Sequence, residues 1–332
     1  MTGKAALESP VSHIGVFTSG GDAPGMNAAI RAVVRTAHFH GLRVSGIYGG
    51  YNGLVNDEVR MLEVRDVSNI IQRGGTILRS ARSAAFRTVE GRSTAKGTLD
   101  HHGIDGLVAI GGDGTFKGAA QFFEEHGVPV VGITGTIDND LAGTDTTIGF
   151  DTATNTAMEA VDRIRDTASS HDRMFFVEVM GRTCGAIALH CGIAAGAEYI
   201  MVPEREQGID ELISALEHAE TSKSSVIVIV AEGDEQGGAY EIARKVKERY
   251  DHYDTRVSVL GHVQRGGNPS VADRVLASRS GVAAVEALIA GHSSTMVGER
   301  QRKMALIPFM EVLSKRQLLE EDLLRILHIL SI

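Results

Sequence analysis

The sequence predicts an α/β protein with two doubly wound, mainly parallel sheets and an active site in the cleft between them. Short apolar runs such as "GLVAIGGDGT" and "VIVIVAEGD" end in glycine-rich turns, which is typical of strands buried on both faces. Amphipathic helical patterns alternate with these runs, and this alternation favours parallel strands joined by helices. The 39 glycines and 6 prolines show no collagen period and no polar low complexity, so they suit tight strand-to-helix turns.

The expected elements follow one another along the chain. Six apolar runs predict strands, within residues 14–22, 106–115, 128–136, 174–185, 226–234 and 257–267. A helix is predicted after Pro24, because apolar residues recur at helical spacing from Met26 to Ala37 and Gly41 stands where a C-terminal cap belongs. Residues 151–173 predict a second helix that leaves the first sheet. Ligands of open α/β sheets bind at the carboxyl ends of the strands, where these glycine-rich turns lie.

Length and composition exclude several classes of protein. A chain of 332 residues with 43% hydrophobic content buries a large core, and its length favours two domains, with a boundary near Asp151. The net charge of −9, without a long Lys/Arg run, argues against nucleic acid as the main partner. No run approaches the ~18 apolar residues of a membrane span, so no membrane partner and a cytoplasmic location are expected. Cys184 and Cys191 are expected to be reduced core residues.

The motif "GGDGT" at Gly111–Thr115 follows a predicted strand and opens a predicted helix. Backbone N–H groups without neighbouring Cβ atoms, together with a helix N-terminus, hold phosphate groups well. Asp113 would then meet the metal that accompanies those phosphates. A plain turn with Asp113 as the N-cap is the alternative. The earlier "TSGGDAPGMNAAIR" repeats the design with Gly20 and Gly21, so the two turns together favour one phosphate-binding edge.

Three carboxylates crowd the loop "GITGTIDNDLAGTD". One capping carboxylate suffices for a turn, so Asp138 and Asp140 indicate a metal, a cationic partner or proton transfer. Asx-turn geometry is the alternative explanation for Asn139 and for one of the aspartates. Cationic side chains also gather in turns near the predicted strands, where guanidinium groups suit phosphate oxygens. They are Arg82, Arg87, Arg173, Arg182, Arg256, His262 and Arg265.

Taken in order, the motifs resemble those of the 6-phosphofructokinase family. They are "TSGGDAPGMNAAIR", "RGGTILRSAR", "IGGDGT", "GTIDND", "SSHDRMFFVEVMGR", "VPE" and "VLGHVQRGG", and the resemblance runs from about Ile14 to Gly298. It implies the ATP-dependent bacterial type, a glycolytic kinase. Such an enzyme transfers the γ-phosphate of ATP to the 1-hydroxyl of fructose 6-phosphate, with Mg²⁺ as cofactor and ATP as co-substrate.

The resemblance assigns roles to individual positions. Asp138 would be the base that takes the proton of the 1-hydroxyl, with Asp140 and Thr136 setting its surroundings. Arg82 and Arg182 would stabilise the transferring phosphoryl group. The implied ATP-binding positions are Gly21, Arg82, Ser83, Gly112, Asp113, Gly114 and Thr115, with Asp113 holding the metal. The implied sugar-phosphate positions are Thr136, Ile137, Asp138, Arg173, Met180, Gly181, Arg182, Glu232, Arg256, His262, Val263, Gln264 and Arg265.

The same resemblance implies which domain binds each substrate and which residues come from a neighbouring subunit. Residues 1–150 with about 266–312 would bind ATP, and residues 151–265 with about 313–332 would bind fructose 6-phosphate. Arg173 and Arg256 would reach the 6-phosphate from a neighbouring subunit of a homotetramer.

A second anion site resembles the family's effector site only in part. Its expected residues are Arg31, Arg35, Arg165, Glu198 and Lys223. Val64 stands where an arginine is expected, Asn69 replaces an aspartate and Thr221 replaces a lysine. Regulation by ADP or phosphoenolpyruvate is therefore expected to be weak or altered.

Four alternatives differ in specific residues. The pyrophosphate-dependent branch of the family tends to carry Asp and Lys where this chain has Gly114 and Gly135, so ATP is favoured. NAD kinases and lipid kinases share GGDGT but lack the later "MGR" and "GHVQRGG" elements. A non-catalytic relative would be expected to lose Asp138 or Asp113. A dehydrogenase would need G-x-G-x-x-G after a strand with an acidic residue about twenty positions later, which is missing here.

Overall fold

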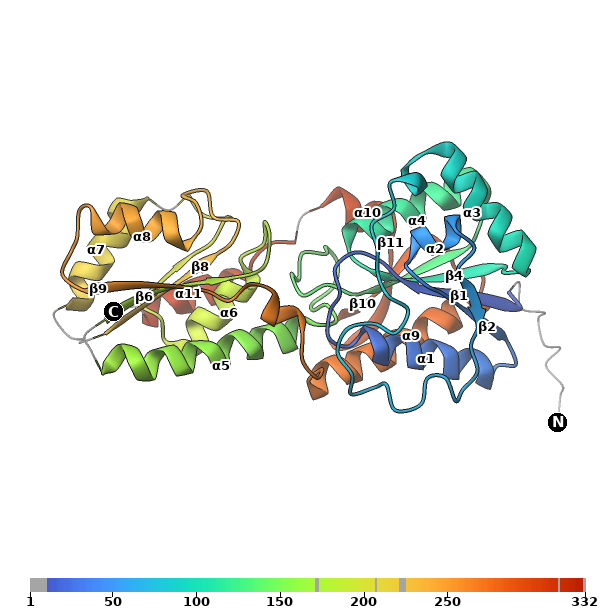
Figure 1. Ribbon diagram of the computed structural model, residues 1–332, viewed down its shortest axis with the longest axis horizontal. Coiled ribbons are helices and arrows are strands. Elements are labelled where there is room, and N and C mark those ends of the chain that lie inside the picture. The colour runs from blue at the N-terminus through green and yellow to red at the C-terminus, as the bar shows by residue number, and fades with distance from the viewer. Residues whose placement is uncertain (1–10, 171–172, 207, 221–224, 316, 331–332) are drawn as a thin grey trace. The chain divides into compact units, whose positions relative to one another are not determined.

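A computed structural model describes residues 11–170, 173–206, 208–220, 225–315 and 317–330 (Figure 1). The chain divides into two compact units. Unit 1 comprises Met1–Thr136, Leu141–Gly149 and Asn268–Arg316, and unit 2 comprises Ile137–Asp140, Phe150–Gly267 and Gln317–Ile332. These ranges place Ile137–Asp140 with the second unit, which the expected ranges do not. Which substrate each unit binds stays a prediction.

Unit 1 is built on a seven-stranded sheet in the order β11-β10-β5-β4-β1-β2-β3. The strands are β1 (His13–Thr18), β2 (Arg43–Ile47), β3 (Val59–Met61), β4 (Gly106–Gly111), β5 (Val130–Thr134), β10 (Thr295–Arg300) and β11 (Lys303–Pro308). The five inner strands pair in parallel, and only the edge strands β3 and β11 pair antiparallel. The expected mainly parallel α/β class is confirmed. The antiparallel edges were not expected, because short strands with mixed polarity give a weak pattern.

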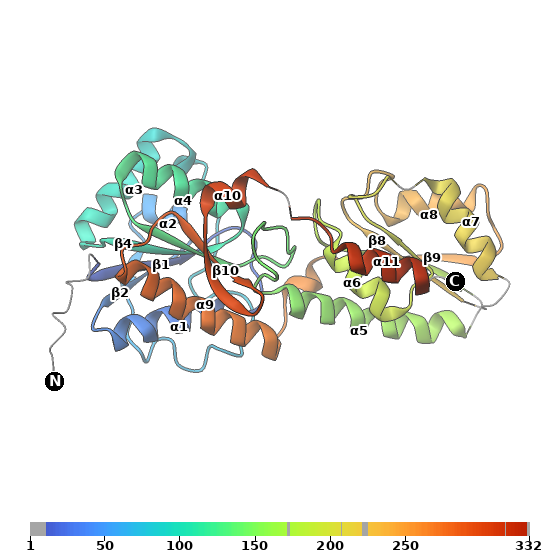
Figure 2. The ribbon, with the colours of Figure 1, turned by 180° about the vertical axis from the view of Figure 1, so that it is seen from behind.

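Helices cover both faces of this sheet. They are α1 (Met26–Phe39), α2 (Tyr51–Val55), α3 (Val89–His102), α4 (Asp113–His126), α9 (Val271–Ile289) and α10 (Phe309–Ser314), with a short 3-10 turn η1 (Ala85–Arg87). Helices α1 and α9 lie on one face, and α2, α3, α4 and α10 lie on the other (Figures 1 and 2). The predicted first helix is confirmed, and Gly41 follows it with φ 75°. Gly281 of α9 faces α1 so closely that a Cβ would lie 2.5 Å from the Cβ of Ala32.

Unit 2 contains a four-stranded parallel sheet in the order β7-β8-β6-β9. Its strands are β6 (Arg173–Val179), β7 (Tyr199–Met201), β8 (Val226–Ala231) and β9 (Asp254–Val259). Its helices are α5 (Phe150–Ser169), α6 (Ala186–Ala195), α7 (Ile209–Glu220), α8 (Ala239–Lys247) and α11 (Glu321–Leu330), with the 3-10 turn η2 (Gly261–Arg265). Helices α7 and α8 cover one face, and α5, α6 and α11 cover the other (Figures 1 and 2).

Two expectations about unit 2 were wrong in detail. The helix expected over residues 151–173 ends at Ser169, and Arg173 instead begins β6, where it pairs with Asp254 in the ladder to β9. The run within residues 257–267 was expected to be buried on both faces. Strand β9 is an edge strand with partly exposed residues, because only β6 pairs with it.

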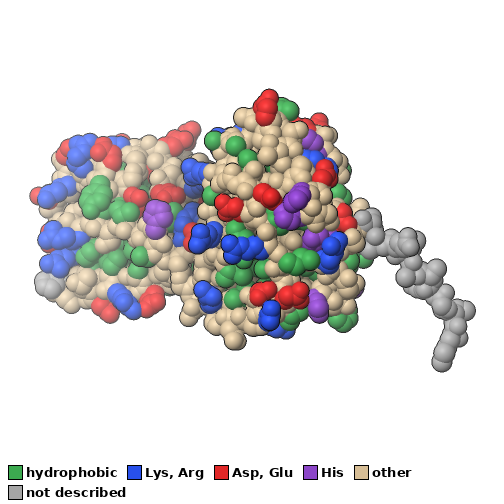
Figure 3. Space-filling model, turned by 45° about the vertical axis from the view of Figure 1, so that its right-hand side comes forward, with side chains coloured by type: hydrophobic (Ala, Val, Ile, Leu, Met, Phe, Trp, Pro, Cys, Tyr) green, Lys and Arg blue, Asp and Glu red, His purple; other side chains and the backbone are tan. Residues whose placement is uncertain are grey.

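The cysteines, the helices and the surface charges bear on the expectations from composition. Both cysteines are buried and free, as expected. No helix among the described residues is long and apolar enough to cross a membrane. On the face shown in Figure 3, acidic and basic side chains are interspersed rather than gathered into one area of a single sign.

Candidate active site

In unit 1, three glycine-rich turns meet at the carboxyl ends of the neighbouring strands β1, β4 and β5. The N–H of Ser19 after β1 donates to the carbonyl of Ile110 (2.9 Å), and the N–H of Gly135 after β5 donates to the carbonyl of Gly111 (2.8 Å). A Cβ on Gly111 would lie 2.3 Å from the Thr115 hydroxyl and 2.5 Å from the Ser19 carbonyl. Packing of the turns after β1 and β4 therefore requires glycine at position 111.

Asp113 and Gly114 open helix α4, and both are accessible. The carboxylate of Asp113 is 46% exposed and lies 2.9 Å from the Lys117 ammonium one turn later. A Cβ built on Gly114 meets no atom within 4 Å. Thr115 is buried, with its hydroxyl donating to the Ser19 carbonyl (3.2 Å). The helix N-terminus thus presents open backbone beside the glycine turns, and an anion binds well at such a place. The Asp113 carboxylate would repel that anion unless a cation lay between them.

The segment that carries Arg82 is held at the end of β1 by a residue that sequence analysis missed. Asn27, buried in α1, accepts from the N–H of Ile77 (2.7 Å) and donates to the carbonyls of Arg73 and Gly74 (3.1 Å each). An amide on an otherwise apolar helix face was the available signal. Arg82 follows with an exposed side chain, and Ser83 accepts from the N–H of Phe86 (3.2 Å). Gly21 is exposed.

In unit 2, Asp138 lies between two arginines. Its carboxylate is 3% exposed, with Arg182 Nε 3.7 Å from one oxygen and Arg265 Nη2 3.8 Å from the other. Both distances are too long for a hydrogen bond, so the attraction is electrostatic. Burial, aided by the charge of Asp140, raises the pKa of Asp138 to about 6, although Arg265 and Arg182 oppose the rise. A carboxylate with this pKa takes up a proton near neutral pH.

The turn after β6 positions Arg182. Gly181 has φ 142° and Arg182 has φ 54°, and a Cβ on Gly181 would lie 2.3 Å from the Cys184 carbonyl. The N–H of Arg182 donates to Glu232, the residue after β8, at 2.8 Å. The sheet order brings the ends of β8 and β6 side by side, so Glu232 is held next to this turn. A left-handed arginine costs conformational energy, and such strain concentrates at functional sites.

The turn η2 after β9 positions Arg265. Gln264 is fully buried, accepts from the N–H of Met180 (3.3 Å) and donates to the carbonyl of Gly261 (3.0 Å). This bond ties η2 to the end of β6, so Gln264 acts on Arg265 by positioning it. His262 and Val263 are exposed on the same turn.

The structure brings Asp138, Arg182, Glu232 and Arg265 together at the carboxyl ends of β6, β8 and β9. It does not bring Arg173 and Arg256 there. Both arginines pair with Asp254, at 3.2 Å and 2.7 Å, near the amino ends of β6 and β9. Arg173 begins strand β6, and the turn that carries Arg182 follows the end of this strand. The strand spans about 20 Å, at roughly 3.3 Å per residue. These two residues lie away from Asp138 of their own chain.

Of the expected effector residues, Arg31 and Arg35 belong to unit 1, and Arg165 and Glu198 belong to unit 2. Arg31 is half-buried on α1, one turn before the exposed Arg35, and burial together with the Arg35 charge lowers the pKa of Arg31. Arg165 donates to the carbonyls of Ala195 (2.6 Å) and Gly196 (3.3 Å), which end α6. Glu198 is buried and accepts from the N–H of Ile227 (2.6 Å). Lys223 and Thr221 lie outside the described residues.

Comparisons with known proteins agree with the expected family. The phosphofructokinase family model matches residues 13–288. The chain is 57% identical over 323 residues to ATP-dependent 6-phosphofructokinase 1 of Thermus thermophilus, covering 97% of this chain and 100% of that protein. A phosphofructokinase structure from Saccharomyces cerevisiae is 40% identical with a TM-score of 0.86, over 91% of this chain and 45% of that longer chain.

A pyrophosphate-dependent phosphofructokinase structure from Marinobacter aquaeolei has a TM-score of 0.82 over 97% of this chain and 92% of that chain. At 23% identity, that likeness shows the fold alone. The matched residues include the turns after β1, β4, β5, β6, β8 and β9 described above. The chain therefore belongs to the phosphofructokinase family.

Proposed function

We propose that this chain is an ATP-dependent 6-phosphofructokinase, which phosphorylates the 1-hydroxyl of fructose 6-phosphate and releases ADP. The observation that carries the proposal is the buried Asp138 carboxylate, with a pKa of about 6, between Arg182 and Arg265. A base of this pKa suits proton removal from a hydroxyl, and paired guanidinium groups suit phosphate oxygens. The names of the relatives at 50 to 57% identity support ATP as the phosphoryl donor.

The proposed reaction uses these residues in turn. Asp138 accepts the proton of the sugar 1-hydroxyl as its oxygen bonds to the γ-phosphorus. The bond from that phosphorus to the β–γ bridging oxygen breaks, and ADP leaves with the electron pair. Arg182, together with Arg82, offsets the charge on the transferring phosphoryl oxygens. Arg265 binds the 6-phosphate with His262, while Met180 and Glu232 contact the sugar.

Asp113 fits a magnesium ion. Mg²⁺ takes one or two carboxylates together with substrate phosphates, and Asp113 offers one accessible carboxylate at the N-terminus of α4 beside the glycine turns. A bound magnesium ion would neutralise part of the phosphate charge. Lys117, which pairs with Asp113, is positioned to help orient that carboxylate. Gly21, Ser83, Gly112, Gly114 and Thr115 belong to the proposed ATP-binding surface.

The position of Arg173 and Arg256 supports a shared site. They project from the end of the sheet remote from Asp138, so they serve the 6-phosphate of a neighbouring subunit in a homotetramer. Asp254 holds the two guanidinium groups together. We propose a cytoplasmic location for this enzyme.

One assay decides between the two phosphoryl donors. Fructose 6-phosphate phosphorylation is measured with ATP and with pyrophosphate, each with Mg²⁺, on the same preparation. We expect turnover with ATP at least a hundredfold above that with pyrophosphate. Equal or greater turnover with pyrophosphate would identify the chain as a member of the pyrophosphate-dependent branch instead.

A further inference from the structure

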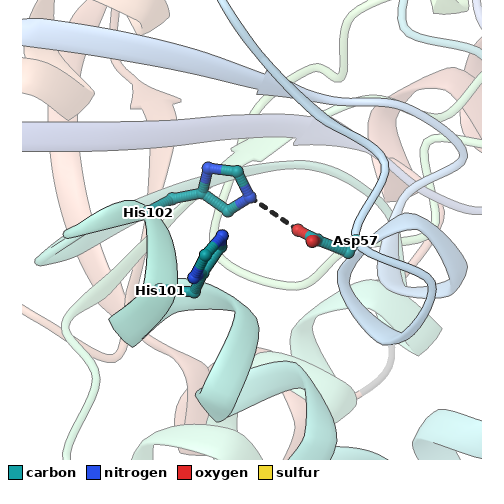
Figure 4. A group of neighbouring side chains, drawn as sticks. All are labelled: Asp57, His101 and His102. Carbon is teal, nitrogen blue, oxygen red and sulfur yellow. Dashed lines mark hydrogen bonds and ion pairs between the residues drawn. The ribbon is translucent and has the colours of Figure 1, made fainter.

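A second group of side chains, unrelated to the proposed active site, has the composition of a transition-metal site. Within the described part of the chain, one group of three His, Cys, Asp or Glu residues has its ligand atoms within 4.8 Å of one another: Asp57, His101 and His102. Figure 4 shows them converging from two segments, with one ring nitrogen of His101 turned toward His102 and Asp57. We propose that this group binds a divalent transition metal of the zinc type.

The backbone presents the three side chains from fixed positions. His101 and His102 are the last residues of α3, which ends at Gly103 (φ 63°), where the N–H of Ile104 donates to the carbonyl of Leu99 (2.9 Å). Asp57 lies in the tight turn between α2 and β3 with φ 58°. The backbone of its neighbour Glu58 forms two hydrogen bonds: its N–H donates to the carbonyl of Gly53 (2.8 Å), and its carbonyl accepts from the N–H of Tyr48 (2.9 Å).

The distances suit a metal after small side-chain movements. His102 Nε2 lies 2.5 Å from Asp57 Oδ1, and the rings of His101 and His102 are edge-on with centroids 5.0 Å apart. Ligands of a tetrahedral zinc, with bonds of about 2.0–2.2 Å, stand about 3.3 Å apart. The closest pair must therefore open by about 0.8 Å, and the wider pairs, all within 4.8 Å, must close by at most about 1.5 Å. Side chains that are 29% and 53% exposed, as His102 and Asp57 are, have room to do so.

The donor set selects the ion. Two imidazole nitrogens and one carboxylate oxygen suit zinc, cobalt or nickel, whereas Mg²⁺ and Ca²⁺ prefer oxygen ligands throughout. The carbonyl end of α3 adds a partial negative charge that favours a cation. With three protein ligands and an exposed rim, water would complete the coordination. Such a metal would link α3 to the turn after α2 and stabilise unit 1.

Replacing His101 distinguishes metal binding from a simple ion pair between His102 and Asp57. A bond between His102 and Asp57 needs no third partner, so replacing His101 leaves that pair intact. A metal loses a ligand when His101 is replaced. His292 is an exposed histidine outside the group, and His292→Ala controls for the loss of a surface imidazole.

The test uses the full chain without a histidine tag, in excess Mg²⁺ and without ATP or sugar phosphate. Co²⁺ binding is followed by visible absorption, and Zn²⁺ is then added to displace it. We expect one Co²⁺ per chain that Zn²⁺ displaces, with affinity unchanged in His292→Ala and at least tenfold weaker in both His101→Ala and Asp57→Asn. No such binding in the unaltered chain, or less than a tenfold loss in His101→Ala, would overturn the proposal. Neither outcome bears on the kinase reaction, because no substrate is present.

Discussion

At the scale of single residues, Asp138 shows how burial and charge compete. Two guanidinium groups lie within 4 Å of its carboxylate, yet its pKa is raised, because removal from water and the nearby Asp140 together outweigh them. A fully hydrogen-bonded carboxylate would stay ionised and would be a weak base. The long distances to Arg182 and Arg265 keep Asp138 basic.

Replacing Asp138 by Ser is expected to lower kcat by at least a hundredfold, because general-base catalysis contributes about that much or more. The KM for ATP should change little, since the carboxylate acts on the sugar hydroxyl. Steady-state kinetics in both substrates measure the two effects. Asp162→Ser, on the exposed side of α5, is the matched control and should retain full activity. Near-normal turnover in Asp138→Ser would remove Asp138 as the base.

The raised pKa of Asp138 also predicts how stability depends on pH. Its pKa is about 6 in the folded chain against 3.8 as the ordinary value, so the folded state binds the proton more tightly. Stability from this group is present below pH 3.8 and is lost as the pH rises to about 6, by at most about 3 kcal/mol. The amide of Asp138→Asn does not titrate, so this variant does not lose stability in this way as the pH rises. Its melting temperature without ligands should exceed that of the unaltered chain by more at pH 8 than at pH 5, whereas a gap independent of pH would contradict the shift.

Sequence motifs indicated which residues lie together at the strand ends, but they did not show which residues act by positioning others, and the catalytic roles stay predictions. Asp138, Arg182 and Arg265 stood in glycine-rich turns after apolar runs, and the structure brings them together. Asn27 is a buried residue whose hydrogen-bond partners are backbone groups 46 to 50 residues away. Gln264, expected among the sugar-phosphate positions, is buried and accepts from the N–H of Met180, 84 residues away. No local pattern reveals such a partner. The group at Asp57 also went unnoticed, because 44 residues separate it from His101 and only the packing of α2 beside α3 joins them.

At the scale of elements, the glycines of the strand-end turns have different reasons to be glycine. A Cβ on Gly135 would meet Met26 Cε at 2.9 Å and Ile110 Cγ2 at 3.1 Å, so packing within unit 1 already requires a small residue there. Gly114 faces open space. Both glycines were expected to leave room for the nucleotide. Of these two glycines, Gly114 has the open space, so we expect Gly114 to be the one that makes room for the nucleotide.

Gly114→Asp is therefore expected to raise the KM for ATP about tenfold or more, because a carboxylate would face the nucleotide phosphates. An acidic residue in the first turn of α4 favours the helix, so the loss would not come from unfolding. Gly97→Asp, at another open helical glycine, is the control. Unchanged ATP kinetics in Gly114→Asp would mean that the nucleotide does not pass this residue.

Element prediction was strongest where the apolar runs were long. Strands β1, β4, β5, β6 and β8 and helix α1 lie where the pattern placed them, since their burial forces a clear period. Edge strands pair on one side only and keep polar residues, so their sequence pattern is weak. For this reason β9 was expected to be more buried than it is, and the β10–β11 hairpin was not expected. The start of β6 at Arg173 depends on pairing with Asp254, which is 81 residues away.

At the scale of the whole molecule, the opposite placement of Arg173 and Asp138 predicts complementation between subunits. Arg173→Ala should raise the KM for fructose 6-phosphate, and Asp138→Ser should lack turnover. Mixed oligomers of the two variants should regain activity, because some sites then take Arg173 and Asp138 from different chains. Activity is measured after co-expression with two distinguishable tags. No recovery in purified mixed oligomers would count against the shared site.

Regulation is a second property of the assembled molecule. Charge-assisted contacts are worth about 1.5–3 kcal/mol each, so the absence of an arginine at Val64 and of a lysine at Thr221 should weaken a phosphate effector at least tenfold. Fructose 6-phosphate saturation with and without millimolar phosphoenolpyruvate or ADP measures this. We expect little change in cooperativity. A strong shift that Arg31→Ala abolishes would show that the remaining cations suffice.

The order of strands in unit 1 has a consequence for synthesis of the chain on the ribosome. Strand β5 pairs on one side with β4, which precedes it, and on the other with β10, where Val131 lies opposite Thr295. At about 5–20 residues per second, roughly ten to thirty seconds of translation separate the two strands. During that time the free edge of β5 is a template for pairing with other chains. The nascent polypeptide therefore carries its aggregation hazard in the middle of its own sequence, and chaperone protection is needed most while unit 2 is being made.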